Sequence, residues 1–143
     1  MPRIYVAGPL FHGHTLSYED ALGNWEKAAL ITDKLMQKGW AVYTPHNSYH
    51  MSKFISEHQK RDISFERWMQ QDSSWLTQCS ALYFLGHSKG ADRELQYALD
   101  NGITVYLSLD EVPNVAPDNY LCPECTEVEH YHTPYREEDD DSD

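Results

Sequence analysis

The stretch at residues 75–107, WLTQCSALYFLG-HSKGADRELQYALDNG-ITVYL, decides the fold of this 143-residue chain. Residues 81–85 form a short apolar run closed by a glycine, which is typical of a strand covered on both faces. Residues 88–90 predict a flexible turn, and a helix follows that turn. A second apolar run at 103–107 predicts the next strand. A strand, a helix and a strand in this order indicate parallel pairing.

The N-terminal half predicts more elements of the same kind. Apolar runs at 4–7 and 40–44 indicate strands, and the spacing of apolar residues indicates helices over 18–38 and 64–78. Residues 45–61 lack a clear period, and we expect either a lid or short helix over a site, or a solvated loop. The predicted fold is therefore a small doubly wound, mainly parallel α/β sheet of the flavodoxin-like or Rossmann-like kind.

Composition and charge divide the chain further. We place the α/β domain at residues 1–110, an extension at 111–132 that begins as a proline-broken linker, and an acidic disordered tail at 133–143. The formal net charge is −12, and the tail holds six acidic residues and one arginine, which leaves −7 for the other 132 residues. This balance argues against general binding of nucleic acid or anionic membranes.

Several sequence features favour a cytoplasmic protein. No apolar run has the length of a membrane span, and the N-terminus lacks the basic and apolar regions of a signal peptide. The cysteines at positions 79, 122 and 125 do not resemble a secreted disulfide framework.

Two carboxylates stand out. Because ligands of open parallel sheets bind beyond the carboxyl ends of the strands, Glu94 is expected at the mouth of a site. Asp72 lies three residues after Met69 and four before Leu76, so it shares their helix face and points toward protein. Paired carboxylates suit glycosidic-bond chemistry, in which one attacks or stabilises the anomeric carbon while another group transfers protons. The alternative is that Glu94 only favours the helix dipole.

Other residues in this region have simpler predicted roles. The Ser88 hydroxyl, nearby backbone N–H groups and Lys89 are suited to holding a phosphate. Trp75 is expected to turn inward from its helix, and Cys79 at the end of that helix is expected in the core.

Three motifs point to a known family. IYVAGPLF at 4–11, WMQQDSSWLTQC at 68–79 and HSKGADRELQYA at 87–98 together resemble the nucleoside 2-deoxyribosyltransferase-like superfamily. They look closest to a small phage and bacterial domain of unknown function assigned to it. The resemblance runs from about residue 4 to residue 107.

The resemblance implies a role for each matching residue. Glu94 matches the glutamate nucleophile, Asp72 the aspartate that assists proton transfer or orients the sugar, and Tyr5 the tyrosine that hydrogen-bonds the nucleophile. Members that cleave deoxynucleoside 5′-monophosphates carry a serine six residues before the glutamate, as Ser88 does here. Asp92 and Arg93 depart from the family pattern, because many members have small or apolar residues at these positions. The expected substrate-binding residues are Gly8, Pro9, Leu10, His46, Gly86, Ser88, Lys89, Gly90 and Asp92.

The resemblance therefore predicts cleavage of the N-glycosidic bond of a nucleoside 5′-monophosphate, with no cofactor required for catalysis. Base exchange by a deoxyribosyltransferase and nucleotide binding without catalysis are the alternatives. A glycohydrolase acting on NAD or ADP-ribose is a weaker one. Because relatives complete the site with a neighbouring subunit, a homodimer or larger assembly is also expected.

The C-terminal extension holds a second candidate site. Two cysteines in a CxxC spacing and two nearby histidines could bind a structural zinc ion. Only four residues separate the second cysteine from the first histidine, which is shorter than a usual zinc-finger loop. The alternative is a surface segment with free thiols. The four candidate ligands are Cys122, Cys125, His130 and His132.

Overall fold

The computed structural model describes residues 1–10 and 18–115. These residues form the four-stranded parallel sheet and alternating helices of a doubly wound α/β domain, which confirms the predicted fold class. The strand order is β2-β1-β3-β4. The elements in chain order are β1 (Arg3–Ala7), α1 (Tyr18–Gln37), β2 (Ala41–Tyr43), η1 (Pro45–Asn47), α2 (Ser48–Gln59), α3 (Phe65–Leu76), β3 (Ala81–Phe84), α4 (Lys89–Asp100), β4 (Thr104–Tyr106) and η2 (Leu109–Glu111).

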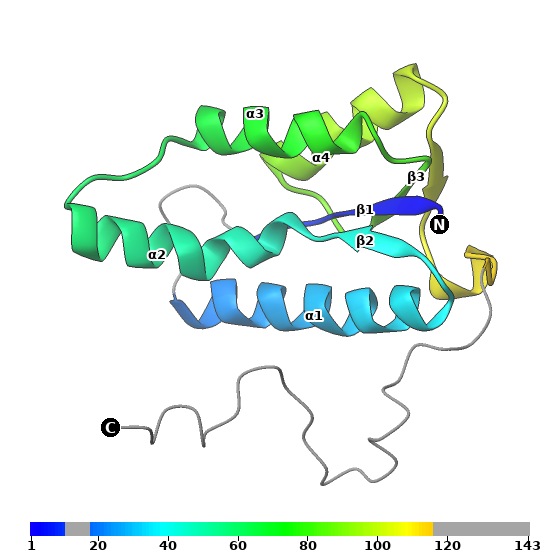
Figure 1. Ribbon diagram of the computed structural model, residues 1–143, viewed down its shortest axis with the longest axis horizontal. Helices are drawn as coiled ribbons and strands as arrows, with labels where there is room; N and C mark the ends of the chain where they lie inside the picture. Colours follow the sequence, from blue (N-terminus) through cyan, green and yellow to red (C-terminus); the bar gives the residue numbers. More distant parts are fainter. Residues whose placement is uncertain (11–17, 116–143) are drawn as a thin grey trace, which may run out of the picture.

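The helices form a layer on each face of the sheet. Helix α1 covers one face, whereas α3 and α4 cover the other (Figure 1). Helix α2 lies beyond the carboxyl ends of the strands, where a doubly wound sheet places its ligands (Figure 1). The N-terminal ends of α3 and α4 therefore lie at the same end of the domain as α2 (Figure 1).

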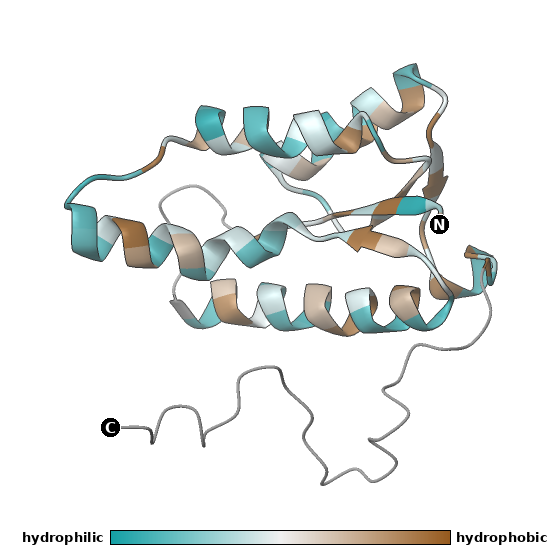
Figure 2. Ribbon diagram, in the orientation of Figure 1, coloured by the Kyte–Doolittle hydropathy of each residue, from teal (hydrophilic) through white to brown (hydrophobic). Residues whose placement is uncertain are grey.

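Alternation along the strands divides the core in two. Ile4 and Val6 of β1 pack on the α1 side with Leu35, whereas Tyr5 and Ala7 pack on the α3–α4 side. This is the period-two pattern of a strand buried on both faces. The helices carry both hydrophobic and hydrophilic stretches, as amphipathic helices do when they cover a sheet (Figure 2).

The structure decides one open local prediction and differs from two others. Residues 45–59, expected to form either a lid or short helix or a solvated loop, form η1 and α2, so the helical alternative is confirmed. Lys89 and Gly90, predicted in a flexible turn, lie in the first turn of α4, because the Ser88 side chain caps that helix by accepting a hydrogen bond from the Ala91 N–H at 3.0 Å. Residues 111–115, expected to begin a linker, pack against the domain: Val112 is buried, and the Trp40 Nε1–H donates to the Pro113 carbonyl at 2.9 Å.

The remaining C-terminal predictions concern residues that the structure does not describe. Residues 116–132 of the extension and the acidic tail at 133–143 lie outside the described residues. Among the helices of residues 1–10 and 18–115, none combines the length and apolar character that crossing a membrane requires.

Candidate active site

Helix α4 places Glu94 against the sheet. Ala91, Glu94 and Ala98 follow helical spacing and are all buried, so they form the face that α4 turns inward. Glu94 is only 5% exposed. The Tyr5 hydroxyl, from the central strand β1, donates a hydrogen bond to the Glu94 Oε2. The structure therefore brings together the two residues that the resemblance paired.

Helix α3 places Asp72 in the same way. Ser64 caps the helix by accepting a hydrogen bond from the Arg67 N–H at 3.1 Å. Asp72 and Leu76 share the buried face of α3, and Asp72 is 7% exposed, as its spacing predicted. The Tyr43 hydroxyl, from β2, donates to the Asp72 Oδ1 at 3.0 Å.

The two tyrosines are neighbours in the sheet. Tyr5 and Tyr43 occupy the same register position of adjacent parallel strands, and their rings stack with centroids 5.4 Å apart. The Tyr43 ring also stacks on Trp75, with centroids 5.7 Å apart. Sequence reasoning did not identify Tyr43 as a site residue. Each buried carboxylate is thus held by a tyrosine hydroxyl, and the two pairs lie side by side.

Burial shifts the proton affinity of both carboxylates. It raises the pKa of Glu94 to about 8, with a further increase from the Asp72 charge, although the Tyr5 hydrogen bond opposes this shift. Burial raises the pKa of Asp72 to about 6, and the Tyr43 hydrogen bond opposes it. Burial also raises the pKa of both tyrosines, so their hydroxyls keep their protons and remain donors. Because the carboxylates interact, the pair loses its protons in two coupled steps.

Both carboxylates line one cavity of about 570 Å³, which is within the usual size range of small-molecule sites. Six of the predicted substrate-binding residues also line it. The full lining consists of Gly8, Leu10, Pro45, His46, Ser48, Ser52, Asp62, Ile63, Phe65, Trp68, Met69, Asp72, Ser88, Lys89, Gly90 and Glu94.

Three predicted substrate-binding residues do not line this cavity. The Asp92 Oδ1 lies 2.7 Å from the His87 Nδ1 on an exposed part of α4, because its position in the helix turns it away from Glu94. Pro9 and Gly86 lie against each other, since a Cβ built on Gly86 would be 3.6 Å from the Pro9 Cδ. They lie in the segments that follow β1 and β3.

Two residues that line the cavity each have a buried polar atom without a hydrogen-bond partner among the described residues. His46 is fully buried, and burial lowers its pKa to about 4, so the ring is neutral and its Nε2–H donates to the Pro9 carbonyl at 3.2 Å. Within the described residues, the His46 Nδ1 and the Trp68 Nε1 are buried and have no hydrogen-bond partner. Sequence reasoning missed Trp68. Unpaired buried polar atoms are rare in native proteins, and both of these belong to residues that line the cavity.

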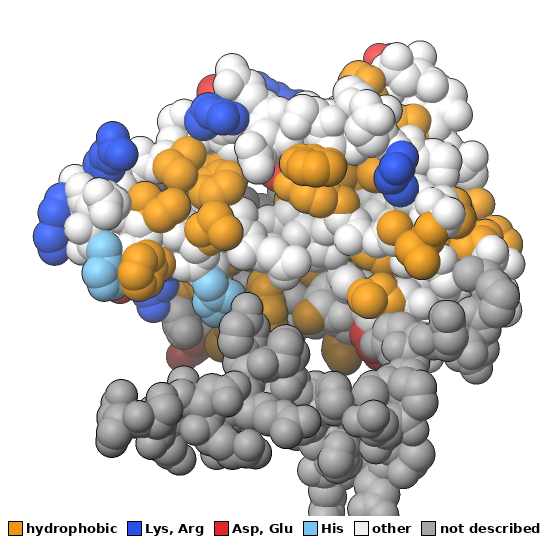
Figure 3. All heavy atoms as spheres, viewed as in Figure 1, with side chains coloured by type: hydrophobic (Ala, Val, Ile, Leu, Met, Phe, Trp, Pro, Cys, Tyr) orange, Lys and Arg blue, Asp and Glu red, His pale blue; other side chains and the backbone are white. Residues whose placement is uncertain are grey.

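Cations and hydrophobic side chains meet near the cavity. The Lys89 Nζ lies 5.5 Å from the Phe65 ring centroid, and the Arg93 guanidinium lies 5.8 Å from it on the same helix as Lys89. The Arg93 Nη1 also donates to the Glu66 carboxylate at 3.2 Å. Figure 3 shows hydrophobic side chains gathered over the α2 and α3 side of the molecule, with Lys and Arg side chains toward the end where these helices connect.

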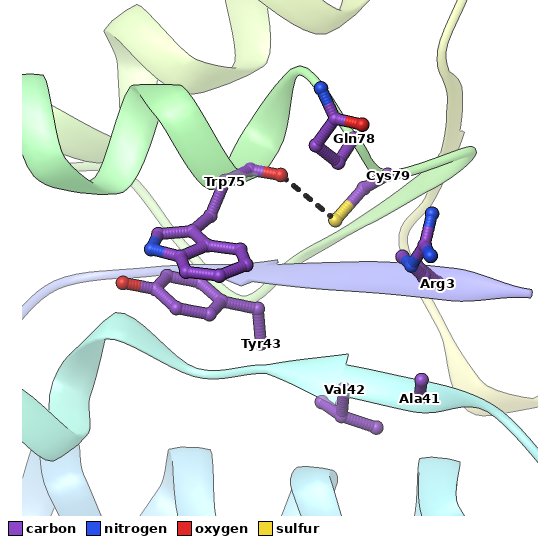
Figure 4. A pocket seen from close by; sticks show the side chains of 7 residues that line it. All are labelled: Arg3, Ala41, Val42, Tyr43, Trp75, Gln78 and Cys79. Atoms are coloured by element: carbon purple, nitrogen blue, oxygen red, sulfur yellow. Dashed lines mark hydrogen bonds between the residues drawn. The ribbon is translucent and has the colours of Figure 1, made fainter.

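A second cavity of about 360 Å³ lies between α3 and the edge strand β2. Figure 4 shows the Trp75 and Tyr43 rings face to face at its wall. The prediction that Trp75 turns inward is wrong: it is 51% exposed, because β2 is the last strand on this side of the described sheet and leaves that edge open. Cys79 is buried, as predicted, and its Sγ–H donates to the Trp75 carbonyl at 3.5 Å.

No group of three or more potential metal ligands occurs among the residues that the structure describes. The zinc prediction concerns Cys122, Cys125, His130 and His132, which lie outside those residues. It stays a prediction.

The profile of one protein family, described as Domain of unknown function (DUF4406), matches residues 2–107. The match spans most of the chain, including all four strands and both carboxylates, so the chain belongs to this family. A search of curated proteins gives no match.

Proposed function

We propose that this DUF4406 protein cleaves the N-glycosidic bond of a nucleoside 5′-monophosphate and releases the free base and the sugar phosphate. The observation that carries the proposal is the pair of buried carboxylates, Glu94 and Asp72, in the wall of one cavity. Each is oriented by a tyrosine hydroxyl. A glycosidase needs two such groups, one to bond with the anomeric carbon and one to handle protons.

In the first step, a carboxylate oxygen of Glu94 attacks C1′. The C1′–N bond breaks, its electron pair leaves with the base, and the base takes a proton from Asp72 or from water. Between the two pKa values the pair carries one proton and one negative charge, which is the total that this division of roles requires. Because Glu94 has the higher pKa, the reactive form with the charge on Glu94 and the proton on Asp72 is the minor of the two arrangements.

In the second step, water attacks C1′ and the bond to Glu94 breaks. The proton of the water goes to a carboxylate of the pair, and the free sugar phosphate departs. The Tyr5 hydrogen bond supports Glu94 as an anion both before the attack and after release. Two displacements at C1′ retain the configuration of the sugar.

The first turn of α4 supports the binding of a phosphate group in the same cavity. Ser88, Lys89 and Gly90 line the same cavity as the carboxylates. Because the Ser88 oxygen already accepts from the Ala91 N–H, the Ser88 hydroxyl hydrogen is available to donate to a phosphate oxygen. The helix N-terminus and the Lys89 ammonium favour an anion there. A Cβ at position 90 would lie 3.2 Å from the Met69 Sδ, so glycine lets α3 approach this turn.

One observation favours a second candidate, nucleotide binding without catalysis. The raised pKa of Glu94 leaves it largely protonated at pH 7 in the empty cavity, and a protonated carboxyl is a poor nucleophile. A bound substrate that transfers the pair's proton to the base would overcome this obstacle. Base exchange, cleavage of NAD or ADP-ribose, and assembly as a homodimer remain proposals that the same assay and a mass measurement in solution can test.

The test incubates purified protein with a panel of ribo- and deoxynucleosides, their 5′-monophosphates and NAD, and detects free base by chromatography. The variants are Glu94→Ala and, as a matched control, Glu57→Ala on the exposed side of α2. We expect base from monophosphates with the wild type and with Glu57→Ala, and none with Glu94→Ala although that variant remains folded.

Other results would change the assignment. Unchanged turnover in Glu94→Ala would refute the catalytic role of that residue. Release that depends on an added free base would indicate a transferase, and release from NAD alone would indicate a glycohydrolase of that type. Monophosphate binding by calorimetry without any release would favour the binding module.

A further inference from the structure

We infer that Tyr43 is a positioning residue for Asp72, and that Trp75 holds Tyr43 in place from the open edge of the sheet. Tyr43 reaches Asp72 through its hydroxyl, and its ring stacks on the rings of both Tyr5 and Trp75. The inference rests on the proposed function and deepens it, because it gives a reason why Asp72 ionises more readily than Glu94.

The position of Tyr43 indicates that its ring contacts fix the direction of its hydroxyl and do more than fill space. Tyr43 lies on the edge strand β2 and is only partly buried, and the 360 Å³ cavity beside it leaves room for its ring to move. Two stacking contacts restrict that movement: the Tyr5 ring plane lies at 29° to the Tyr43 ring plane, and the Trp75 ring plane lies at 19° to it. A ring stacked on two neighbouring rings keeps its hydroxyl directed at the Asp72 Oδ1.

The hydrogen bond from Tyr43 controls the ionisation of Asp72. The bond from Tyr43 favours the ionised form of Asp72 and lowers its pKa against the effect of burial. Tyr5 and Glu94 form the corresponding pair next to it. The titratable or charged groups around Asp72 are Tyr5 on β1, Tyr43 on β2, His46 on η1, Asp62 before α3, Cys79 after α3, and Lys89 and Glu94 on α4.

The structural consequence is an asymmetric pair. Tyr43 stabilises the charge on Asp72, and Asp72 in turn raises the pKa of Glu94. Removing the Tyr43 hydroxyl would make Asp72 hold its proton more tightly and would leave its carboxyl free to rotate. A neutral donor bonded to a carboxylate shifts its pKa by about one unit.

The experiment titrates the side-chain carboxyl carbon of Asp72 by NMR in the ¹³C-labelled full chain, in the wild type and in Tyr43→Phe. Phenylalanine keeps the ring and its stacking but removes the donor. We expect the Asp72 pKa to rise by about one unit in Tyr43→Phe. The matched control is Tyr106→Phe on β4, which packs edge-on against Trp40 and should leave the Asp72 titration unchanged. An unshifted Asp72 in Tyr43→Phe would overturn the inference.

The kinetic arm uses the nucleotide that the wild type cleaves. For Tyr43→Phe we expect kcat to fall about tenfold, KM to stay within about twofold, and the acidic limb of the pH profile to move up with the Asp72 pKa. Trp75→Ala should lower kcat about 2- to 10-fold, and Trp75→Phe should restore most of it because it restores the stack. A loss in Trp75→Ala that Trp75→Phe does not repair would refute the role of Trp75.

The NMR titration and the kinetic measurement distinguish a wrong proposed function from a wrong positioning role. If the wild type cleaves no nucleotide, the proposed function is wrong, but the NMR titration still decides whether Tyr43 positions Asp72. If the wild type is active and Tyr43→Phe shifts neither the titration nor the pH profile, the proposed function stands and the positioning role is wrong. Near-ultraviolet circular dichroism shows whether each variant keeps its tertiary packing.

Discussion

The two faces of the sheet are built from the same strands but have different chemistry. On the α1 side, Ile4 and Val6 pack with Leu35 in a core of hydrophobic residues. On the α3–α4 side, Tyr5 occupies the position between them and its hydroxyl donates to the buried Glu94. A single strand, β1, therefore contributes to both a stabilising core and a polar site.

The two buried carboxylates, whose burial is energetically unfavourable, both lie on the same side of the sheet. Burying a carboxylate is unfavourable unless it is hydrogen-bonded, and both Asp72 and Glu94 lie on the α3–α4 side with raised pKa values. The α1 side has the buried Thr44, whose hydroxyl lies 2.6 Å from that of Thr32. We expect substitutions on the α1 side to change stability, and substitutions of the carboxylates to change activity.

The largest expected effect separates the two faces by activity. Glu94→Gln should lower kcat/KM for the cleaved monophosphate by about 10³-fold or more, because the amide is a poor nucleophile. Leu35→Ala on the other face should keep the wild-type kcat/KM at any temperature where it remains folded. A similar loss in both variants, measured by base release, would contradict the division between the faces.

The pH dependence of cleavage should follow the protonation of Glu94 and Asp72. One proton on the two carboxylates gives an active form between the apparent pKa values of about 6 and about 8. Below this range Glu94 cannot attack because both groups are protonated, and above it neither can donate. We expect a bell-shaped profile of kcat/KM that falls about tenfold for each pH unit beyond its limbs. A flat profile from pH 5 to 9 would exclude the pair as acid and nucleophile.

Leu35→Ala should lower the stability of the protein, whereas Glu94→Gln lowers its activity. Leu35 is fully buried in the α1-side core, so the substitution leaves a cavity and should lower the free energy of unfolding by about 2–5 kcal/mol. The matched control is Leu99→Ala on α4, where the side chain is 60% exposed and the expected change is about 0.5 kcal/mol or less. Urea denaturation of the three proteins tests this, and equal losses would show that burial does not decide the cost.

A further prediction concerns the stability cost of the site itself. The folded protein holds the Glu94 proton more tightly than the unfolded chain, since the pKa rises from 4.5 to about 8. Stability should therefore fall as pH rises between these values, by about 1.4 kcal/mol per pH unit at most from this group. Glu94→Gln has no such proton, so its stability advantage over the wild type should grow from pH 5 to pH 8. An unchanging difference would mean that Glu94 is not buried as a carboxyl.

Much of the fold and part of the site could be predicted because their signals are local. The apolar run before Gly86 marks β3, and the spacing of Asp72 from Met69 and Leu76 correctly predicts a buried carboxylate. Glu94 stood out through its position in the helix after a buried strand, and the structure places it in the cavity wall.

The remaining features depend on contacts between distant segments. Tyr43 becomes a site residue only because β2 pairs with β1 in the register that sets it beside Tyr5. Trp75 is exposed because β2 ends the described sheet on that side, which its helical spacing cannot show. The sequence of α2 mixes polar and aromatic residues, so its helical period is weak, and its position over the strand ends comes from the tertiary packing.

The covalent intermediate tests the central claim most directly. A nucleotide analogue with fluorine at C2′ destabilises the positively charged transition states, so an enzyme-bound sugar phosphate should accumulate. We predict that intact-mass spectrometry finds the wild type heavier by one fluorinated sugar phosphate, that peptide mapping assigns the adduct to Glu94, and that Glu94→Gln shows none. Base release from the natural nucleotide with no adduct, or an adduct on another residue, would contradict Glu94 as the nucleophile.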